Sequence, residues 1–217
     1  MTVLLNYMNS PQREIYKQFI SSNNIMEAQK YSNIAYPKKQ KNNDIIKENI
    51  YNFDELFTYN KQSDSYIINL DYKSDALDLL NNLDKYSSKL DSMIRNISEH
   101  NIQGKIFIYS QYIDPDNGGG KFIALLLENI GYQRKIVKKN KLQINNYFNN
   151  SDIKRNNKFY IRLDGSTSTN DRNFYINEFN HSNNLNGDNI QIIIGSTNLF
   201  EGVSLFNLRE VHILDPW

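Results

Sequence analysis

Apolar residues recur three or four positions apart in one stretch of the chain, at Leu90, Met93, Ile94 and Ile97. This spacing places their side chains on one face of a helix, and Ser87 or Ser88 can cap the start of that helix. The pattern therefore predicts a helix over 88–100. Similar patterns predict helices over 121–129 and 170–180.

Short apolar runs rich in β-branched residues alternate with these helices. They are apolar on both faces, which is typical of central strands in a parallel sheet. The expected strands are 106–109, 159–163, 190–194 and 211–214. Because strands alternate with helices, the sequence predicts an α/β fold with a doubly wound parallel sheet flanked by helices. His212 falls on the last of these strands, so we expect its side chain to be buried and hydrogen-bonded.

The first 82 residues are patterned more weakly. Ser10-Pro11 predicts the start of a helix, with the serine as N-cap and the proline in the first turn. Residues 31–37 are expected to be extended, since a proline disfavours helical backbone at the residue before it. A short helix is expected around 45–50. We therefore interpret 1–82 as an irregular, partly helical segment.

The stretch 135–158 is basic and rich in asparagine, with few apolar positions. We interpret it as a long insertion. Its charges favour a solvated loop, and the alternative is that they contact a nucleic-acid backbone. The cationic residues in question are Lys135, Lys138, Lys139, Lys141, Lys154, Arg155 and Lys158.

The composition narrows the classes of function. The net charge is +1, so any electrostatic footprint for nucleic acid has to be local. The absence of cysteine excludes disulfides and thiolate zinc sites, and the three histidines lack the spacing of metal ligands. No apolar run approaches the roughly 20 residues of a membrane-spanning helix, and the first ten residues lack the basic region of a signal peptide. We therefore expect an intracellular protein with no membrane partner and no metal site.

Three of the expected strands end in small polar residues, namely Ser110-Gln111, Asp164-Gly165-Ser166-Thr167 and Gly195-Ser196-Thr197. The carboxyl ends of strands line the binding crevice of an open α/β sheet. Glycines let backbone N–H groups approach an anion, and hydroxyl groups add hydrogen bonds, which suits the phosphates of a nucleotide or of a nucleic acid. The alternative is that these residues serve only as turn formers and helix caps.

Four stretches resemble motifs of superfamily 2 helicases and translocases, and they occur in that family's order. Lys105–Tyr112 resembles motif IV. Arg162–Thr167, with Arg172 after it, is similar to the Asp-Gly-Ser-Thr motif of the chromatin-remodeller-like branch. Gly195–Leu205 resembles motif V, with its Ser-Thr pair, a later glycine and an apolar-polar-apolar triplet. Val211–Trp217 resembles the strand just ahead of motif VI.

Within the superfamily, the chain is most similar to helicase-like ATPases of poxviruses and giant DNA viruses, including the small subunit of the early transcription factor. Ser10–Tyr16 and Ser32–Pro37 resemble the segment that precedes the second lobe in those proteins. The resemblance implies that 83–217 is a C-terminal RecA-like lobe cut before motif VI, and that 1–82 connects it to a first lobe.

The resemblance also implies roles for individual residues. Contacts to the nucleic-acid backbone would come from Ser110, Gln111, Gly165, Ser166, Thr167, Ser196 and Thr197. Residues near the nucleotide would be Glu201, Gly202 and Ser204. Many relatives carry an acidic residue that binds the ribose where this chain has Ser204, so that role is not supported here.

Parts of an ATPase site are absent from the 217 residues. Gly118-Gly119-Gly120-Lys121 does not fit the phosphate-loop pattern, and we interpret it as a turn that enters a helix. Asp54-Glu55 lacks the apolar strand that precedes a magnesium-binding acid pair. We therefore predict no ATP hydrolysis and no bound cofactor for this chain alone, with ATP and Mg²⁺ bound mainly by the first lobe.

The partners that the resemblance implies are DNA or RNA, the first lobe of the same parent chain, and viral transcription machinery. The virion or the host cytoplasm is the implied location. A second hypothesis stays open: a non-catalytic α/β module that binds a protein or a nucleic acid without an ATPase cycle.

Overall fold

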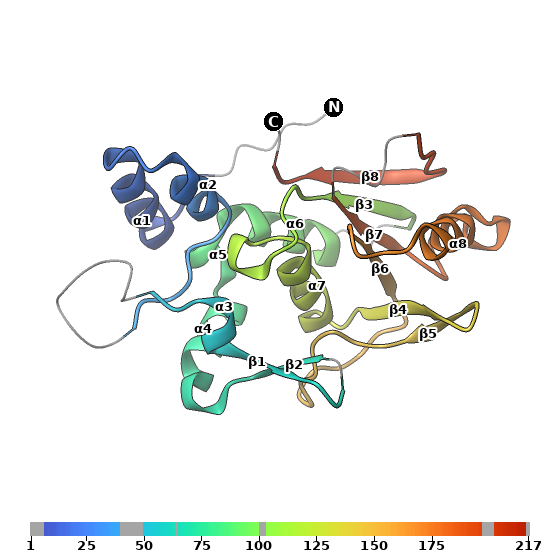
Figure 1. The fold of residues 1–217 in the computed structure, drawn as a ribbon, viewed down its shortest axis with the longest axis horizontal. Helices are drawn as coiled ribbons and strands as arrows, with labels where there is room; N and C mark the ends of the chain where they lie inside the picture. The colour runs from blue at the N-terminus through green and yellow to red at the C-terminus, as the bar shows by residue number, and fades with distance from the viewer. Residues whose placement is uncertain (1–6, 40–49, 64, 100–102, 197–201, 216–217) are drawn as a thin grey trace.

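The structure is a computed structural model that describes residues 7–39, 50–63, 65–99, 103–196 and 202–215 (the backbone alone at 26 and 27). Its centre is a six-stranded sheet in the order β5-β4-β6-β7-β3-β8 (Figure 1). The strands are β3 Lys105–Tyr109, β4 Gln133–Lys138, β5 Lys141–Ile144, β6 Phe159–Leu163, β7 Ile192–Gly195 and β8 Leu208–Ile213. All neighbouring pairs are parallel except β4 and β5, which are antiparallel.

Helices cover both faces of this sheet, and further helices and a hairpin pack outside it. The α-helices are α1 Ser10–Ser21, α2 Ile25–Asn33, α3 Phe53–Leu56, α4 Lys73–Asn81, α5 Leu83–Tyr86, α6 Ser88–Glu99, α7 Gly120–Asn129 and α8 Thr169–Asn180. The hairpin consists of β1 Phe57–Asn60 and β2 Ser65–Ile68, and the 3-10 turns are η1 Leu70–Tyr72, η2 Pro115–Asn117 and η3 Ser182–Asn184. The predicted α/β class with a mainly parallel, helix-flanked sheet is confirmed, and it is consistent with a RecA-like lobe.

The strands divide their side chains between two cores, as the period of a strand requires. Ile106, Ile108 and Ile192 belong to a large core that also takes in α6 and α7. Phe107 and Ile193 face the other way, into a smaller core under α8. Figure 1 shows α6 and α7 on one side of the sheet and α8 on the other.

Helix α7 is apolar from Phe122 to Leu127, and these residues are covered on every side. Phe122, Ile123, Leu125 and Leu127 are all fully buried. The same core includes apolar side chains of α1, α2 and the β1-β2 hairpin, so residues before and after position 82 pack together. The expected boundary between 82 and 83 stays a prediction.

The three patterned helices are confirmed as α6, α7 and α8. Helix α1 also forms, but its N-cap is Asn9, and Ser10 is already the first helical residue. Residues 31–33 are helical rather than extended, because the chain leaves α2 only after Asn33. The short helix expected around 45–50 falls almost wholly outside the described residues.

The expected loop over 135–158 is corrected by the structure, which places most of β4 and all of β5 at its start. Their residues are half-buried or exposed, so they lack the apolar run that identifies a central strand. The last strand also differs from the prediction, because β8 pairs only with β3 and lies at the edge of the described sheet. His212 on β8 is mostly buried, and its Nε2 lies 2.7 Å from Glu210 Oε1.

No helix in the described ranges is long and apolar enough to cross a membrane.

Candidate nucleic-acid interface

Three polar turns meet at one edge of the sheet, as the sequence predicts. Gly195 at the end of β7 is the register partner of Leu163 in β6 and of Tyr109 in β3. The residues that follow these three strands are therefore neighbours. Ser110, Asp164 and Ser196 line one cavity of about 10 Å³, which is room for about one water molecule. This edge is hereafter called the carboxyl edge.

The turn after β6 is stabilised by its own residues. The Asp164 amide donates to Thr167 Oγ1 at 3.1 Å, and the Ser166 amide donates to Asp164 Oδ1 at 3.0 Å. Burial raises the pKa of Asp164, but the hydrogen bonds from Ser166 and the nearby Arg162 outweigh it and hold the pKa below its usual value. Gly165 and Ser166 are exposed, and a Cβ at Gly165 would meet no atom within 4 Å. The turn thus presents open backbone on a fixed scaffold.

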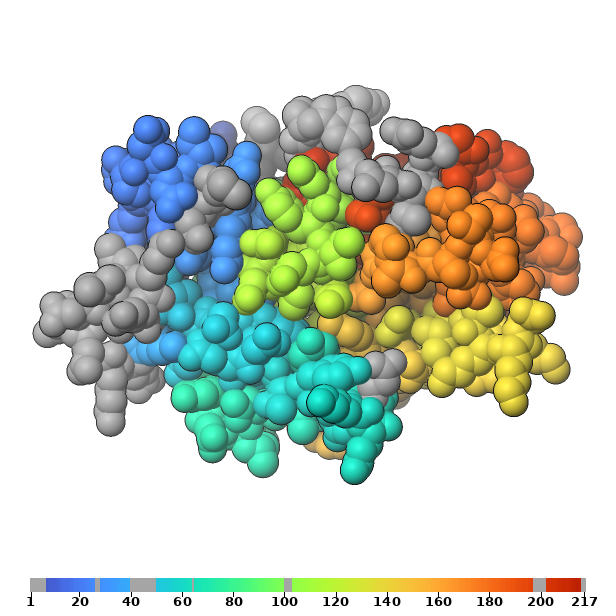
Figure 2. All heavy atoms as spheres, in the orientation of Figure 1, coloured from blue at the N-terminus to red at the C-terminus, as the bar shows by residue number. Residues whose placement is uncertain are grey.

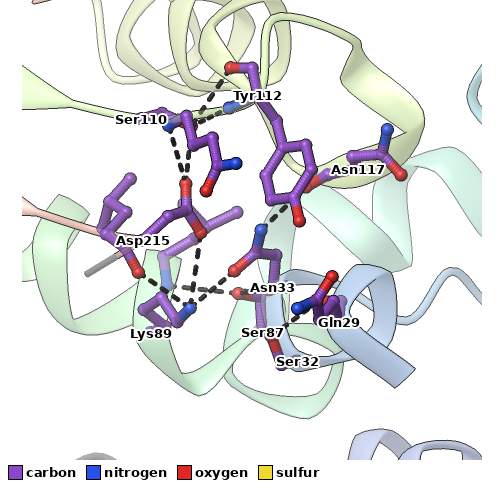
Figure 3. Close-up of polar contacts among 12 residues, drawn as sticks. Gln29, Ser32, Asn33, Ser87, Lys89, Ser110, Tyr112, Asn117 and Asp215 are labelled. Atoms are coloured by element: carbon purple, nitrogen blue, oxygen red, sulfur yellow. Dashed lines mark hydrogen bonds and ion pairs between the residues drawn. The ribbon is translucent and has the colours of Figure 1, made fainter. Parts of the chain in front are cut away.

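The turn after β3 is built differently, because its serine is committed to the interior (Figure 3). Ser110 is 1% exposed, and its hydroxyl donates either to Asp215 Oδ2 at 2.9 Å or to the Tyr112 carbonyl at 3.1 Å. The Gln111 amide also donates to Asp215 Oδ2, at 3.1 Å, while the Gln111 residue is exposed. The predicted phosphate contacts of Ser110 and Gln111 stay predictions. In this structure Ser110 and Asp215 hold the turn, and Gln111 is the residue that faces outward.

Asp215 is connected in turn to the N-terminal helices through Lys89 on α6. Lys89 Nζ lies 3.8 Å from Asp215 Oδ1, and it donates to Asn33 Oδ1 at 2.5 Å and to the Leu214 carbonyl at 2.9 Å. Burial lowers the pKa of Lys89, and Asp215 opposes that shift. Figure 3 shows this network between α2, α6 and the turn after β3. The sequence reasoning did not assign roles to Lys89 and Asp215, although Asp215 stands directly after a strand.

The remaining predicted residues divide between this edge and other places. Ser196 is buried at the carboxyl edge, whereas Thr197 and Glu201 lie outside the described residues. Gly202 is exposed and has a φ of +76°, a conformation that favours glycine.

Ser204 lies away from the carboxyl edge. Its carbonyl accepts from Asn180 Nδ2 at 2.8 Å, at the last residue of α8. Since α8 begins beside the Asp164 turn and has 12 residues, its two ends are about 18 Å apart. The structure therefore does not bring Ser204 to Gly165 and Ser166, and its predicted place near a nucleotide stays a prediction.

The glycine-rich turn before α7 is a helix entry, as interpreted from the sequence. The Gly120 and Lys121 amides donate to the carbonyls of Tyr112 and Ile113 at 2.9 and 3.1 Å. A Cβ at Gly119 would lie 2.5 Å from the Tyr112 carbonyl oxygen, which explains the requirement for glycine there. These amides are used within the protein rather than turned toward a phosphate.

The acid pair at 54–55 lies in the first turn of α3. Asn52 and Glu55 form a capping box at the start of this helix. Among the described residues no strand precedes the pair, and the interpretation that it is not a magnesium-binding motif stays a prediction.

The basic residues of 135–158 serve different purposes. Arg155 donates to the carbonyls of Glu128, Tyr132 and Phe148, and Lys135 donates to the Asn189 carbonyl at 2.8 Å. These two are therefore structural. Others are exposed at the surface: Lys138, Lys139, Lys141 and Lys154.

The relatives found by comparison with known proteins are named as helicases. No profile of a known protein family matches the chain. It is 30% identical over 135 residues to the "Uncharacterized killer plasmid pGKL-2 helicase" of Kluyveromyces lactis, covering 62% of this chain and 19% of that protein. It is 26% identical over 206 residues to the "Putative ATP-dependent RNA helicase R563" of Acanthamoeba polyphaga mimivirus, covering 94% of this chain and 28% of that protein.

A third relative is the "Putative helicase 087L" of Invertebrate iridescent virus 3, which is 29% identical over 137 residues. The chain is distantly homologous to viral and plasmid proteins named as helicases. It contains a helicase-related domain and spans less than a third of the length of these relatives.

Proposed function

We propose that the chain is the C-terminal lobe of an ATP-dependent DNA or RNA helicase or translocase. The observation that carries the proposal is the carboxyl edge, where three polar turns of a helicase-related domain stand side by side. In this role the lobe grips the backbone of one strand and closes on ATP that a first lobe binds. Residues 1–82 connect the two lobes.

The exposed groups of the edge make the backbone contacts. Gly165 offers exposed backbone without a side chain in the way, and Gln111 adds an outward-facing residue. Ser166 is exposed as well, and in the free protein its amide and hydroxyl both donate to Asp164 Oδ1. Ser110 acts from behind, by fixing the turn that carries Gln111. Thr167 and Thr197 belong to the same proposed set, and Ser196, which is buried, lies behind the edge as Ser110 does. Glu201, Gly202 and Ser204 are the residues proposed to lie near the nucleotide in the closed state.

Hydrolysis belongs to the two lobes together. Phosphoryl transfer needs a phosphate-binding lysine, magnesium carboxylates and a positioned arginine. The 217 residues contain no phosphate loop. We therefore expect no nucleic-acid-stimulated ATP hydrolysis by the purified chain. ATP and Mg²⁺ bind mainly to the first lobe, and viral transcription machinery is the proposed setting.

The backbone grip is tested by fluorescence anisotropy with labelled single-stranded DNA and RNA. Gly165→Ala adds a methyl group that clashes with nothing in the free protein, so the melting temperature should not change. If a phosphate sits on this turn, affinity should fall about five- to ten-fold, the effect of one to two lost hydrogen bonds. Unchanged affinity would refute the contact at Gly165.

A second variant adds charge instead of volume. Gln111→Glu places a negative charge on the exposed residue after β3, and it should weaken binding about five-fold. Gln18→Glu is the matched control, because Gln18 is an exposed residue of α1, a helix that Figure 1 shows apart from the sheet. Equal effects of the two variants would show a general charge effect rather than a contact.

The non-catalytic module remains the rival, and the surrounding reading frame separates the two. An in-frame Gly-Lys-Thr loop and Asp-Glu pair upstream, with a Gln-x-x-Gly-Arg-x-x-Arg pattern downstream, supports the helicase. Nucleic-acid binding by a reading frame without these motifs supports the module.

A further inference from the structure

A cleft of about 690 Å³ opens on the molecule beside the carboxyl edge. It is hereafter called the tyrosine cleft and is lined by Asp54, Phe57, Thr58, Tyr59, Tyr66, Lys121, Arg134, Tyr147 and Arg162. The β1-β2 hairpin forms one wall, and residues of α7, β4 and β6 form the other. Figure 2 shows the hairpin, in cyan and teal, and β4 and β5, in yellow, on the lower part of the same face.

Three tyrosine rings stand in a row along the cleft. Tyr59 and Tyr66 are register partners across the hairpin, with ring centroids 5.2 Å apart. The Tyr66 and Tyr147 centroids are 5.0 Å apart, and the Tyr66 amide donates to the Tyr147 carbonyl at 2.7 Å. The row runs from buried Tyr147 to Tyr59, which is 44% exposed. It therefore presents aromatic surface to solvent on a backbone held by hydrogen bonds.

A buried carboxylate fixes the inner end of the row. Glu128 on α7 is fully buried, and it accepts from the Tyr147 and Phe148 amides at 2.6 and 2.7 Å and from the Tyr160 hydroxyl at 2.5 Å. Burial raises the pKa of Glu128, and these hydrogen bonds oppose the shift. The buried Glu128 side chain holds the backbone amides of Tyr147 and Phe148 in place. It thereby fixes the part of the chain that carries the Tyr147 ring.

The opposite wall is cationic. Lys121, Arg134 and Arg162 line the cleft, against the single carboxylate of Asp54. The guanidinium carbons of Arg134 and Arg162 lie 5.9 and 5.4 Å from the centre of the Tyr147 ring. Arg162 reaches Asp164 with one nitrogen, at 3.2 Å, while its Nε and Nη1 find no hydrogen-bond partner among the described residues. These two nitrogens are buried, so the half-buried Lys121 and Arg134 are the more accessible cations. The cleft thus holds aromatic faces beside cationic side chains.

We propose that the tyrosine cleft binds single-stranded nucleic acid by its bases, which stack on the exposed ring of Tyr59 at the outer end of the row. The cationic wall of Lys121, Arg134 and Arg162 faces the phosphates. Aromatic stacking beside a basic groove is the combination that binds single strands without sequence preference. This inference rests on the proposed function and extends it, because the carboxyl edge contacts only the backbone.

The cleft and the carboxyl edge share one residue, Arg162. This side chain lines both the cleft and the small cavity shared by Ser110, Asp164 and Ser196. In this proposal a strand whose phosphates lie on the edge reaches the cleft past Arg162. The edge contacts the backbone of the nucleotide chain, and the cleft contacts its bases.

The test compares two fluorescein-labelled oligonucleotides of equal length, one of oligothymidylate and one with abasic sugars throughout. The chain should bind oligothymidylate at least about five-fold more tightly, the smallest gain from one stacked base. Tyr59→Leu should remove most of this preference, and Tyr59→Phe should keep it because the ring remains. Tyr7→Leu is the matched control, since Tyr7 is 84% exposed and lies outside the cleft.

The outcomes separate the two proposals. Equal binding of both oligonucleotides, unchanged by Tyr59→Leu, overturns the cleft and leaves the backbone grip in place. Binding of neither oligonucleotide overturns the proposed function and the cleft with it.

Photocross-linking places the base directly and does not depend on any variant. An oligonucleotide with 5-iodouracil should cross-link to Tyr59 or Tyr66 on irradiation, as mapped by mass spectrometry of the digested chain. Cross-links confined to peptides outside the cleft overturn the inference.

Discussion

The carboxyl edge and the tyrosine cleft are neighbours with opposite character. At the edge, polar side chains are engaged within the protein, Ser110 with Asp215 and Asp164 with Ser166, and the enclosed space is about 10 Å³. In the cleft the walls stand apart around about 690 Å³, and Arg162 keeps nitrogen atoms without a protein partner. The edge carries the residues that resemble helicase motifs, while the cleft carries the accessible surface.

The residues that resemble helicase motifs are therefore not the same set as the residues that are accessible to a ligand. Ser110 belongs to the stretch that resembles motif IV, yet its hydroxyl is used to hold a turn. Tyr59 and Tyr66 belong to no motif, yet Tyr59 provides an exposed ring, with the half-buried ring of Tyr66 beside it. Variants of the edge and of the cleft separate these two roles, and the largest effect is expected at the cleft.

The largest effect is expected from removing the carboxylate behind the cleft. Glu128→Ala leaves two buried amides, of Tyr147 and Phe148, and the Tyr160 hydroxyl without an acceptor. Each lost partner costs about 1–3 kcal/mol, so the free energy of unfolding should fall by about 3 kcal/mol or more. Urea denaturation measures it, with Glu99→Ala at an exposed end of α6 as the control. A loss no larger than that of the control would show that the cleft wall does not depend on Glu128.

The same carboxyl group makes stability depend on pH. Burial, opposed by the hydrogen bonds from Tyr160 and the two amides, raises the pKa of Glu128 in the folded protein above its value in the unfolded chain. The folded state therefore binds more protons between these two pKa values, and stability should fall as pH rises through that window. Glu128→Gln should flatten this part of the pH profile of the melting temperature. A profile that keeps its slope in Glu128→Gln would assign the slope to another group.

A smaller loss of stability is expected at the edge. Asp215→Ala removes the partner of Lys89 and leaves the Ser110 hydroxyl and the Gln111 amide with one acceptor fewer. Because Lys89 keeps some solvent exposure and a second set of hydrogen bonds, we expect a loss of about 2 kcal/mol rather than the larger cost of a fully buried pair.

The control for Asp215→Ala is Asp91→Ala, which breaks an ion pair with Arg95 at the surface of α6. That change should alter stability by at most about 0.5 kcal/mol. If both variants behave alike in urea denaturation, the network behind the edge contributes no more than a surface pair.

A gain of affinity is expected from neutralising Asp54, the one acid among the described residues that line the cleft. Burial, followed by the charges of Asp116 and Asp114, raises the pKa of Asp54. As pH falls through this raised pKa, the carboxylate is neutralised, the cleft becomes more positive, and oligonucleotide binding should tighten. Asp54→Asn should strengthen binding about two- to five-fold above that pKa and remove the pH dependence. Asp71→Asn, at an exposed position of η1, should do neither.

The smallest effect is expected in the salt dependence of binding. Arg134→Gln removes one cation of the cleft, so the slope of log affinity against log salt should become shallower by about 0.7, the value for one phosphate of a single strand. Lys141→Gln removes a cation from the exposed end of β5 and should leave the slope unchanged. A reversed result would move the contact from the cleft to the β4-β5 turn.

The sequence was sufficient for the parts of the fold that repeat a period. Helices α6 and α8 follow a helical stripe, and β3 and β7 are short isoleucine-rich runs between turns. The polar turns lie together because the carboxyl ends of neighbouring parallel strands are at the same edge of the sheet. Strand β5 was not predicted because it lies at the edge of the sheet and all of its residues but one are exposed, so it has no apolar run.

The tyrosine cleft could not be predicted in the same way. Tyr66 and Tyr147 are 81 positions apart, and each lies in a stretch without a clear period. Glu128 stands on an expected helix where a charged residue is ordinarily solvated, so nothing in the sequence indicates that it is fully buried. Long-range pairing of poorly patterned segments is set by tertiary packing, which local patterns do not encode.

The network around Lys89 has a mechanical consequence. Asn33 is one hydrogen bond from Lys89, Lys89 is one ion pair from Asp215, and Asp215 is one hydrogen bond from the Gln111 amide. A displacement of α2 therefore reaches the turn after β3 in three steps, none of which passes through the strands. The network therefore ties the position of the Gln111 backbone to that of α2 by side-chain contacts that lie outside the sheet.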